Sequence, residues 1–423
     1  HMGLLVFTCF ALLMIAFGNG LFKGNLQAIV GQMYDNFEAD AAKQGHDALK
    51  EAQGKRDSGF QIFYVFINIG GLVAPFVAPL LRSWWLKVNG FIYNSQLPRL
   101  CHEFISNGTQ SDNFMAEATK SITDPAVLQS LAQGGEAVGT FCTNYLDVFN
   151  AGIHYSFIAS VAAMMISLVI FLVNKKKFPT PAKKAASANA GYTAEEKATM
   201  AKEIKQRMYA LFAVLGVVIF FWLAFHQNGQ SLSLFARDFV NTDKIAPEIW
   251  QAVNPFFVIV LTPIIMWIFG ALGKRGKQIS TPRKIAYGMG IAATAYLFLA
   301  IFSGVMGYPS ATDFRGMEVA QQATMKAGPW VLIATYFFLT VAELFISPLG
   351  LSFVSKVAPK HLLGLCQGLW LGATAVGNLF LWIGPLMYNK MPLWACWSVF
   401  LCMCLLAMGV MLGMVKWLEK VTK

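Results

Sequence analysis

The chain has 423 residues, of which 56% are hydrophobic and only 13% are charged, and its formal net charge is +11. A charged fraction this low excludes a soluble multidomain enzyme. The 14% of aromatic residues excludes an intrinsically disordered chain. The composition predicts a polytopic membrane protein.

Nine stretches are apolar over at least the roughly 20 residues that a helix needs to cross a bilayer. None alternates like a barrel strand, and a span must satisfy its own backbone groups, so we expect an all-α protein with nine transmembrane helices. Prolines within the spans, among them Pro255 and Pro263, are expected to kink their helices. The stretches are 3–33, 58–82, 151–173, 207–236, 249–272, 284–307, 330–354, 363–388 and 394–417.

Basic residues are unevenly distributed among the connections between these spans. Most of the 33 Lys and Arg residues lie in alternate loops and in the tail 416–423. By the positive-inside rule these loops are cytoplasmic, which places the N-terminus outside and the C-terminus inside. The positive charge therefore indicates topology, and we expect a multi-pass protein of the plasma (inner) membrane with the lipid bilayer, not nucleic acid, as its surroundings. The basic loops are 35–56, 174–207, 274–284 and 356–361.

The segment 174–206 is the most highly charged of these connections and is expected to be a cytoplasmic linker, with an amphipathic helix over 193–206. It leaves three spans before it and six after it. Transporters of the major facilitator type have two bundles of six helices. We therefore interpret 1–173 as the second half of an N-terminal bundle and 207–423 as a complete C-terminal bundle.

On this plan the chain carries helices 4–12, and helices 1–3 are absent. His1 precedes Met2, so the chain is either an internal piece of a longer protein or begins with a cloning scar. The sequence leaves open whether the missing helices are absent from the gene.

The predicted extracytoplasmic loop 83–150 is long and polar, and it contains Cys101 and Cys142. These cysteines form a disulfide if the compartment is oxidising. Two unpaired thiols are equally compatible with the sequence, because spacing does not supply the geometry of the pair.

Three ionisable residues lie deep within spans, where charge is unfavourable and commonly functional. Glu343 is either a functional carboxylate or a neutral carboxyl bonded to a backbone carbonyl. Lys23 is either a site residue or a lysine that extends toward the membrane surface. His226 is either part of a proton relay or a hydrogen-bonded core histidine.

Uncharged polar groups occur in several spans at similar depth. Tyr64 and Asn68 share one helix face, Asn254 precedes Pro255, and Trp370 lies in a later span. They are either hydrogen-bond links between helices or, together with Glu343 and Lys23, the lining of a cavity for a zwitterion. The histidines show no metal-ligand spacing and the sequence has no phosphate-binding loop, so we expect neither enzymatic activity nor a cofactor or metal.

Six motifs resemble, in order, those of the proton-dependent oligopeptide transporter (POT/PTR) family of the major facilitator superfamily. They match the motifs of that family's helices 4, 5, 7, 8, 10 and 11. The motifs are GNGLFKGN at 18–25, RDSGFQIFYVFINIG at 56–70, QNGQSLSLFA at 227–236, VNPFF at 253–257, ELFISPLGLS at 343–352 and GLWLGATAVGN at 368–378.

The resemblance implies a monomeric symporter, driven by a proton gradient, that imports di- and tripeptides by alternating access. By the same resemblance, Lys23 lies near the peptide carboxylate, and Glu343 pairs with the peptide amino terminus. Asn68 and Asn254 contact the peptide backbone. The proton-coupling candidates are Lys23, His226 and Glu343, and the aromatic residues that line the pocket are Tyr64 and Trp370.

The chain departs from the family pattern in two places. The acidic helix-1 motif is absent together with helices 1–3, and His226 occupies a position where the family often has glutamate. Two alternatives therefore remain open. One is a transporter of the same fold for another small solute, such as nitrate or a drug, and the other is a membrane subunit that senses peptides without transporting them.

Overall fold

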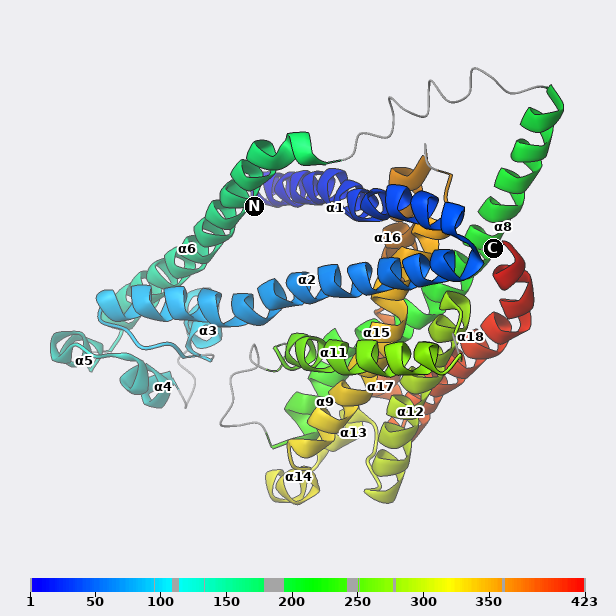
Figure 1. Cartoon of the computed structure of the whole chain (residues 1–423). Coiled ribbons are helices and arrows are strands. Elements are labelled where there is room, and N and C mark those ends of the chain that lie inside the picture. The colour runs from blue at the N-terminus through cyan, green and yellow to red at the C-terminus, as the bar shows by residue number, and fades with distance from the viewer. Residues whose placement is uncertain are drawn as a thin grey trace. The chain divides into compact units, whose positions relative to one another are not determined.

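The computed structural model describes residues 2–94, 96–108, 114–132, 134–178, 194–241, 250, 252–276, 279–359 and 362–421 (Figure 1). Helices account for nearly all of this described part of the chain. Their bounds are α1 Met2–Gln44, α2 His46–Val88, α3 Leu97–Asn107, α4 Phe114–Ser121, α5 Pro125–Leu131, α6 Glu136–Asn174, η1 Lys175–Lys177, α8 Ala194–Phe225, η3 His226–Gly229, α9 Ser231–Phe239, α11 Val253–Lys274, α12 Thr281–Val305, α13 Ala311–Gly316, α14 Val319–Met325, α15 Trp330–Val357, α16 Leu363–Leu379, α17 Ile383–Lys390 and α18 Leu393–Val421.

Within the described residues, nine helical segments are long and apolar enough to cross a membrane. Each coincides with one of the nine predicted spans, so the prediction of an all-α polytopic membrane protein is confirmed. The predicted amphipathic helix over 193–206 is not a separate element, because α8 begins at Ala194 and continues into the span. The rest of the predicted linker, 179–193, lies outside the described residues.

The chain divides into two compact units, one of residues His1–Gly70 with Phe178–Lys423 and the other of Gly71–Lys177. Helix α2 contributes its first part to the first unit and its last part to the second. The domain boundaries at 173 and 207, which we infer from the expected six-plus-six plan, stay a prediction.

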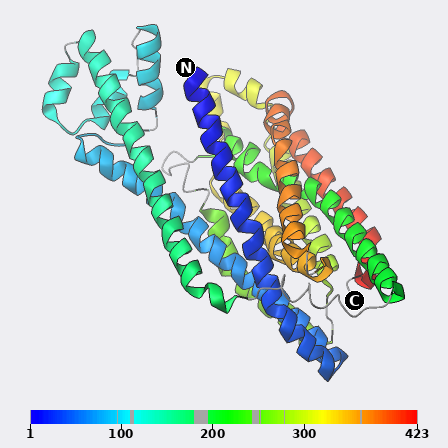
Figure 2. The ribbon, with the colours of Figure 1, turned by 90° about the horizontal axis from the view of Figure 1, so that it is seen from above.

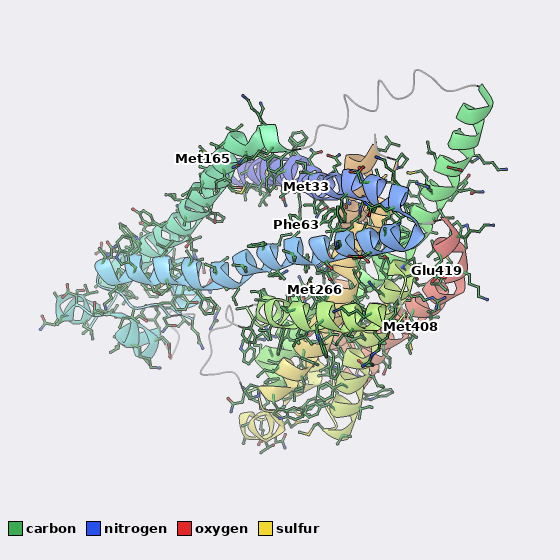
Figure 3. All side chains as sticks on the ribbon, viewed as in Figure 1. Met33, Phe63, Met165, Met266, Met408 and Glu419 are labelled. Atoms are coloured by element: carbon green, nitrogen blue, oxygen red, sulfur yellow. The ribbon has the colours of Figure 1, made fainter. Side chains whose placement is uncertain are left out.

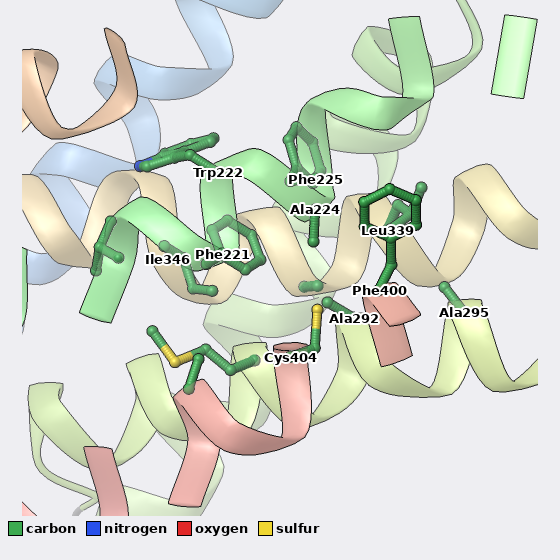
Figure 4. Close-up of a cluster of buried hydrophobic side chains, with 14 of the residues drawn as sticks. Phe221, Trp222, Ala224, Phe225, Ala292, Ala295, Leu339, Ile346, Phe400 and Cys404 are labelled. Carbon is green, nitrogen blue, oxygen red and sulfur yellow. The ribbon is translucent and has the colours of Figure 1, made fainter. Parts of the chain in front are cut away.

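The core of the first unit lies where α8, α12, α15 and α18 pack together (Figure 4). Small residues of α12 allow the close approach of its neighbours: a methyl group added at Gly288 would lie 2.7 Å from Cβ of Phe345 on α15. Aromatic side chains of α8, among them Phe221 and Phe225, fill the space opposite. This packing supports α15, the helix that carries Glu343.

Helix α1 runs beside α16 in the same unit (Figure 2). A methyl group added at Gly24 would lie 3.6 Å from the backbone nitrogen of Gly368, so the two backbones approach closely. Small residues have this function at many helix contacts in membranes. The contact places the Lys23 segment of α1 next to α16.

The prediction that Pro255 kinks its helix is wrong. Helix α11 begins at Val253, so Pro255 lies in its first turn. The first turn of a helix tolerates proline, because the amide groups there have no intrahelical acceptor. Pro263 does lie inside α11.

Two predicted spans are interrupted. Helix α8 ends at Phe225 and is followed by the 3₁₀ turn η3 and then by α9. Helix α16 ends at Leu379, and α17 begins only at Ile383. In a membrane such interruptions require partners for the freed backbone groups, and they concentrate polar atoms inside the first unit.

The second compact unit has a hydrophobic core of its own, formed by the end of α2, the start of α6 and the short helices α3–α5. Phe91 packs edge-on against Tyr145, with ring centroids 5.3 Å apart. The guanidinium of Arg82 lies 4.1 Å from the ring centre of Tyr93. The polar loop expected over 83–150 is therefore a folded structure, which the polarity of its sequence does not indicate.

Candidate functional site

Glu343 lies at the meeting point of α2, α11 and α15, and only 6% of its surface is exposed. The hydroxyl of Tyr64 donates a hydrogen bond to its Oε1. The side-chain amide of Asn254 donates to its Oε2 over 2.7 Å and to the hydroxyl of Thr340 over 3.0 Å. Two helices, α2 and α11, therefore direct hydrogen-bond donors at one buried carboxyl group of α15.

The surroundings of this group are apolar. Val258 and Ile265 of α11 and Leu344 of α15 form a small cluster against which Tyr64 packs. Figure 3 shows α2 and α11 in this region, with Phe63 and Met266 labelled. An apolar wall strengthens each hydrogen bond to Glu343 and makes an unpaired charge there unfavourable.

Asn68 is buried one turn beyond Tyr64 on α2, and its side-chain amide donates to the carbonyl of Tyr64 over 2.9 Å. It is thus turned back along its own helix. Trp370 of α16 is also buried, and its indole covers Gly350, where an added methyl group would lie 2.0 Å from the ring. The described contacts bring Tyr64 and Asn254 to Glu343, and they do not bring Trp370 to it.

His226 occupies the interruption between α8 and α9. Its ring stacks on Trp222 with centroids 5.0 Å apart, and its Nδ1 is buried without a hydrogen-bond partner in the described part of the chain. Its polar neighbours are Asn378 of α16 and Lys23 of α1, whose charge acts on the ring. The structure thus associates Lys23 with His226, and within the described residues no contact joins Lys23 to Glu343.

The two helix interruptions are joined by Gln227. Its side-chain amide donates to the carbonyl of Leu381, over 3.2 Å, in the break between α16 and α17. Its Oε1 accepts a hydrogen bond of 2.7 Å from Ser231. Gly384 makes room for this arrangement, since an added methyl group would lie 2.0 Å from Oε1. The same amide donates to the carbonyl of Leu223, near the end of α8, over 3.4 Å, so Gln227 provides a partner for one backbone carbonyl at each break.

A second polar cluster lies near the start of α2 and the end of α15, and its residues are not among the predicted site residues. Asp57 is buried and accepts hydrogen bonds from Lys356 over 2.6 Å, from Lys284 over 3.3 Å and from Thr281 over 3.4 Å. The hydroxyl of Ser352 donates to it as well. This Asp57 cluster ties α2 to α12 and α15.

Arg56, the neighbour of Asp57, extends the same contact. It forms an ion pair of 2.7 Å with Asp35 of α1 and donates to the carbonyl of Ser355 over 3.2 Å. The only sequence signal for either residue is the motif RDSGF at 56–60. In the second unit, Cys101 and Cys142 are both fully buried and lie in one core.

The chain matches the POT family (PTR2) over residues 3–194 and 180–393. It is 28% identical over 385 residues to the peptide transporter YePEPT of Yersinia enterocolitica subsp. palearctica, covering 87% of this chain and 66% of that protein. It is 26% identical over 368 residues to dipeptide and tripeptide permease B of Salmonella typhimurium, covering 84% of this chain and 62% of that protein. The chain thus spans slightly less than two thirds of the length of these relatives.

Among solved structures, the crystal structure of peptide transporter POT in complex with sulfate has a TM-score of 0.47 and 17% sequence identity, over 94% of this chain and 95% of that one. A likeness at this level does not bear on substrate or mechanism. The family match, by contrast, extends over most of the sequence and confirms the resemblance carried by the six motifs. The chain belongs to the POT family.

Proposed function

We propose that this chain is part of a proton-coupled symporter that imports di- and tripeptides across the plasma membrane by alternating access. Membership of the POT family and the names of the relatives, a peptide transporter and a dipeptide and tripeptide permease, support peptides as the substrate class. The observation that carries the proposal is the buried carboxyl group of Glu343, held by Tyr64 and Asn254.

Glu343 is suited to bind a peptide amino terminus because its described partners are neutral donors. No ion pair to Glu343 forms within the described residues, so the charged carboxylate lacks a cation. A buried carboxylate in this state is unfavourable by several kcal/mol, and either a proton or an ammonium group relieves it. A proton and a peptide amine therefore exclude each other at Glu343, so in a symporter another group must carry the proton while the peptide amine is bound there.

The opposite end of a peptide requires positive charge. Lys23 is the only Lys or Arg that lies away from the ends of a predicted span. Its charge acts on His226. We place the peptide carboxylate at this pair, so that the two ends of the zwitterion meet opposite charges. A histidine gains charge on protonation, in contrast to a glutamate, which loses it. A carboxylate bound here would favour the protonated imidazole.

Alternating access requires contacts that hold one end of the helices together and are then released. The Asp57 cluster is a candidate for that contact, because it joins α2 to α12 and α15 at the end that the charge distribution predicts to be cytoplasmic. Its buried charges become hydrated when the helices separate, which lowers the free energy required to break it. The interruptions near His226 and Leu379 provide points at which helices bend.

The Glu343→Gln variant tests the amine-binding role. Glutamine keeps the shape of the side chain and its bond to Asn254 but cannot be negatively charged. We expect uptake of a labelled dipeptide with a free amino terminus into membrane vesicles to fall at least about tenfold, since a charged hydrogen bond in a buried site contributes about 1.5–3 kcal/mol.

The matched control is Glu203→Gln, which alters an exposed carboxylate near the start of α8 and should leave uptake unchanged. Normal uptake by Glu343→Gln, at equal amounts of protein in the membrane, would refute the amine-binding role. Binding of the dipeptide without measurable flux in the unaltered protein would instead indicate a peptide-sensing subunit.

A further inference from the structure

The second compact unit contains two cysteines whose positions the transport function does not explain. Both are fully buried in the core formed by α3, α4 and α6. Cys101 lies on α3 and Cys142 on α6, two helices in contact, and both are free thiols in the structure that interact with each other. The sequence alone leaves a disulfide and two separate thiols equally open, so this proximity is new information.

The packing of the two helices accounts for the proximity independently of the thiols. A methyl group added at Gly139 of α6 would lie 3.8 Å from the ring of Phe104 on α3. One turn back along α3 is Cys101, and one turn forward along α6 is Cys142. In two antiparallel helices, one turn back along the first helix lies opposite one turn forward along the second. The contact of Phe104 with Gly139 therefore places the two cysteines opposite each other.

Their surroundings are aromatic and apolar. The ring of Phe114 on α4 lies 6.3 Å from that of Phe141, the neighbour of Cys142. Both sulfur atoms are fully buried among these rings. An external thiol or oxidant therefore does not reach the folded pair, which is unlike a reactive redox centre, where the thiol is partly exposed.

We propose that Cys101 and Cys142 form a structural disulfide bond that fixes α3 to α6. The inference rests on the topology proposed above, which places this unit on the extracytoplasmic side, where disulfides persist. Each thiol loses one hydrogen as the S–S bond forms, and a protein oxidant of the dithiol–disulfide class accepts both electrons and both protons to become a dithiol. The exchange proceeds through a mixed disulfide.

The bond forms before the core closes, because both sulfur atoms are inaccessible afterwards. It shortens the covalent path between the end of α2 and the start of α6, and it confines the short helices α3–α5 to their positions against α6. Such a constraint acts mainly by reducing the freedom of the unfolded chain. The disulfide bond would keep this unit folded in a compartment that lacks the cytoplasmic chaperones.

The test is a two-step labelling of the full chain, expressed in cells with an oxidising extracytoplasmic compartment. Free thiols are blocked with N-ethylmaleimide in denaturing detergent. The sample is then reduced and treated with a polyethylene-glycol maleimide that retards the protein on a gel. We expect two additions after reduction and none without it. The variants Cys101→Ser and Cys142→Ser should each lose both additions, because the remaining thiol is blocked in the first step.

Cys9→Ser, which alters an exposed cysteine of α1, is the control and should retain both additions. No addition in the unaltered chain, or two additions in Cys101→Ser, would overturn the inference. The variant Ser130→Cys separates this failure from a failure of the topology. Its exposed thiol should react with a membrane-impermeant maleimide in intact cells. If this variant is labelled but the disulfide is absent, only the disulfide is refuted. If both the labelling and the disulfide are absent, the proposed topology is refuted as well.

Discussion

At the scale of single residues, the proposed binding of a peptide amine depends on how Glu343 is held. Tyr64 and Asn254 come from different helices and donate to different oxygen atoms of the carboxylate. Both donors are themselves fixed, Tyr64 by the apolar cluster of α11 and α15 and Asn254 by its second bond to Thr340. The carboxylate is thus oriented before a substrate arrives, which reduces the free energy lost on ordering it.

Tyr64→Phe tests this orientation without altering the charge of the site. The phenyl ring keeps the packing against α11, and only the hydroxyl is removed. We expect the KM for dipeptide uptake to rise about tenfold, because a hydrogen bond to a charged group contributes about 1.5–3 kcal/mol. Tyr287→Phe, on the exposed face of α12, is the matched control, and an unchanged KM for Tyr64→Phe would contradict the assigned role.

The sequence indicated Glu343, Asn254 and Tyr64 individually, because polar groups in apolar spans are conspicuous. It did not indicate their contacts, since Tyr64 precedes Glu343 by 279 residues and no local pattern fixes which faces meet. Thr340 was not among the predicted site residues, for a different reason. Threonines in membrane helices commonly bond their own backbone, as Thr340 also does to Tyr336, so its second function as a partner of Asn254 leaves no trace in the sequence.

At the scale of helices, the Asp57 cluster is the contact that most clearly joins elements distant in sequence. Lys284 comes from α12 and Lys356 from α15, and both point at one carboxylate at the start of α2. All three side chains are largely buried. Two lysines without their carboxylate would leave uncompensated charge in a poorly hydrated site.

Asp57→Asn should therefore weaken the association of α2 with α12 and α15. Removing one partner of a buried ion pair destabilises by about 3–5 kcal/mol, and thermal unfolding in detergent should show a lower midpoint. The triple variant with Lys284→Met and Lys356→Met should recover much of the loss, because it removes the unpaired charges. A midpoint for Asp57→Asn equal to that of the unaltered protein would contradict the proposed contact.

The positions of the helices were predictable, and their interruptions were not. Apolar runs of about 20 residues identify spans reliably, but residues 380–382 are as compatible with a helix as their surroundings. In 226–229 only Asn228 and Gly229 disfavour a helix, which by itself does not predict a break. The breaks become visible only through their partners, such as Gln227, which donates to Leu381 from a distant helix. Tertiary contacts therefore decide where these helices end.

At the scale of the whole molecule, the six motifs predicted the family, and the match over most of the chain confirms it. The folded core of the second unit was not predicted, because its buried residues come from five helices, α2 to α6, and the apolar face of each helix does not show which other helix it packs against. Charge distribution remains the only guide to orientation. For the whole protein, we propose that a proton gradient drives peptide uptake.

The most direct test measures uptake of a labelled dipeptide into vesicles that contain the protein, with an inward proton gradient and with the gradient collapsed by a protonophore. We expect accumulation of the labelled dipeptide above the external concentration only while the gradient persists. We also expect an excess of unlabelled dipeptide to reduce this uptake. Equal uptake under both conditions would contradict proton coupling, and uptake that unlabelled dipeptide does not reduce would contradict a peptide substrate.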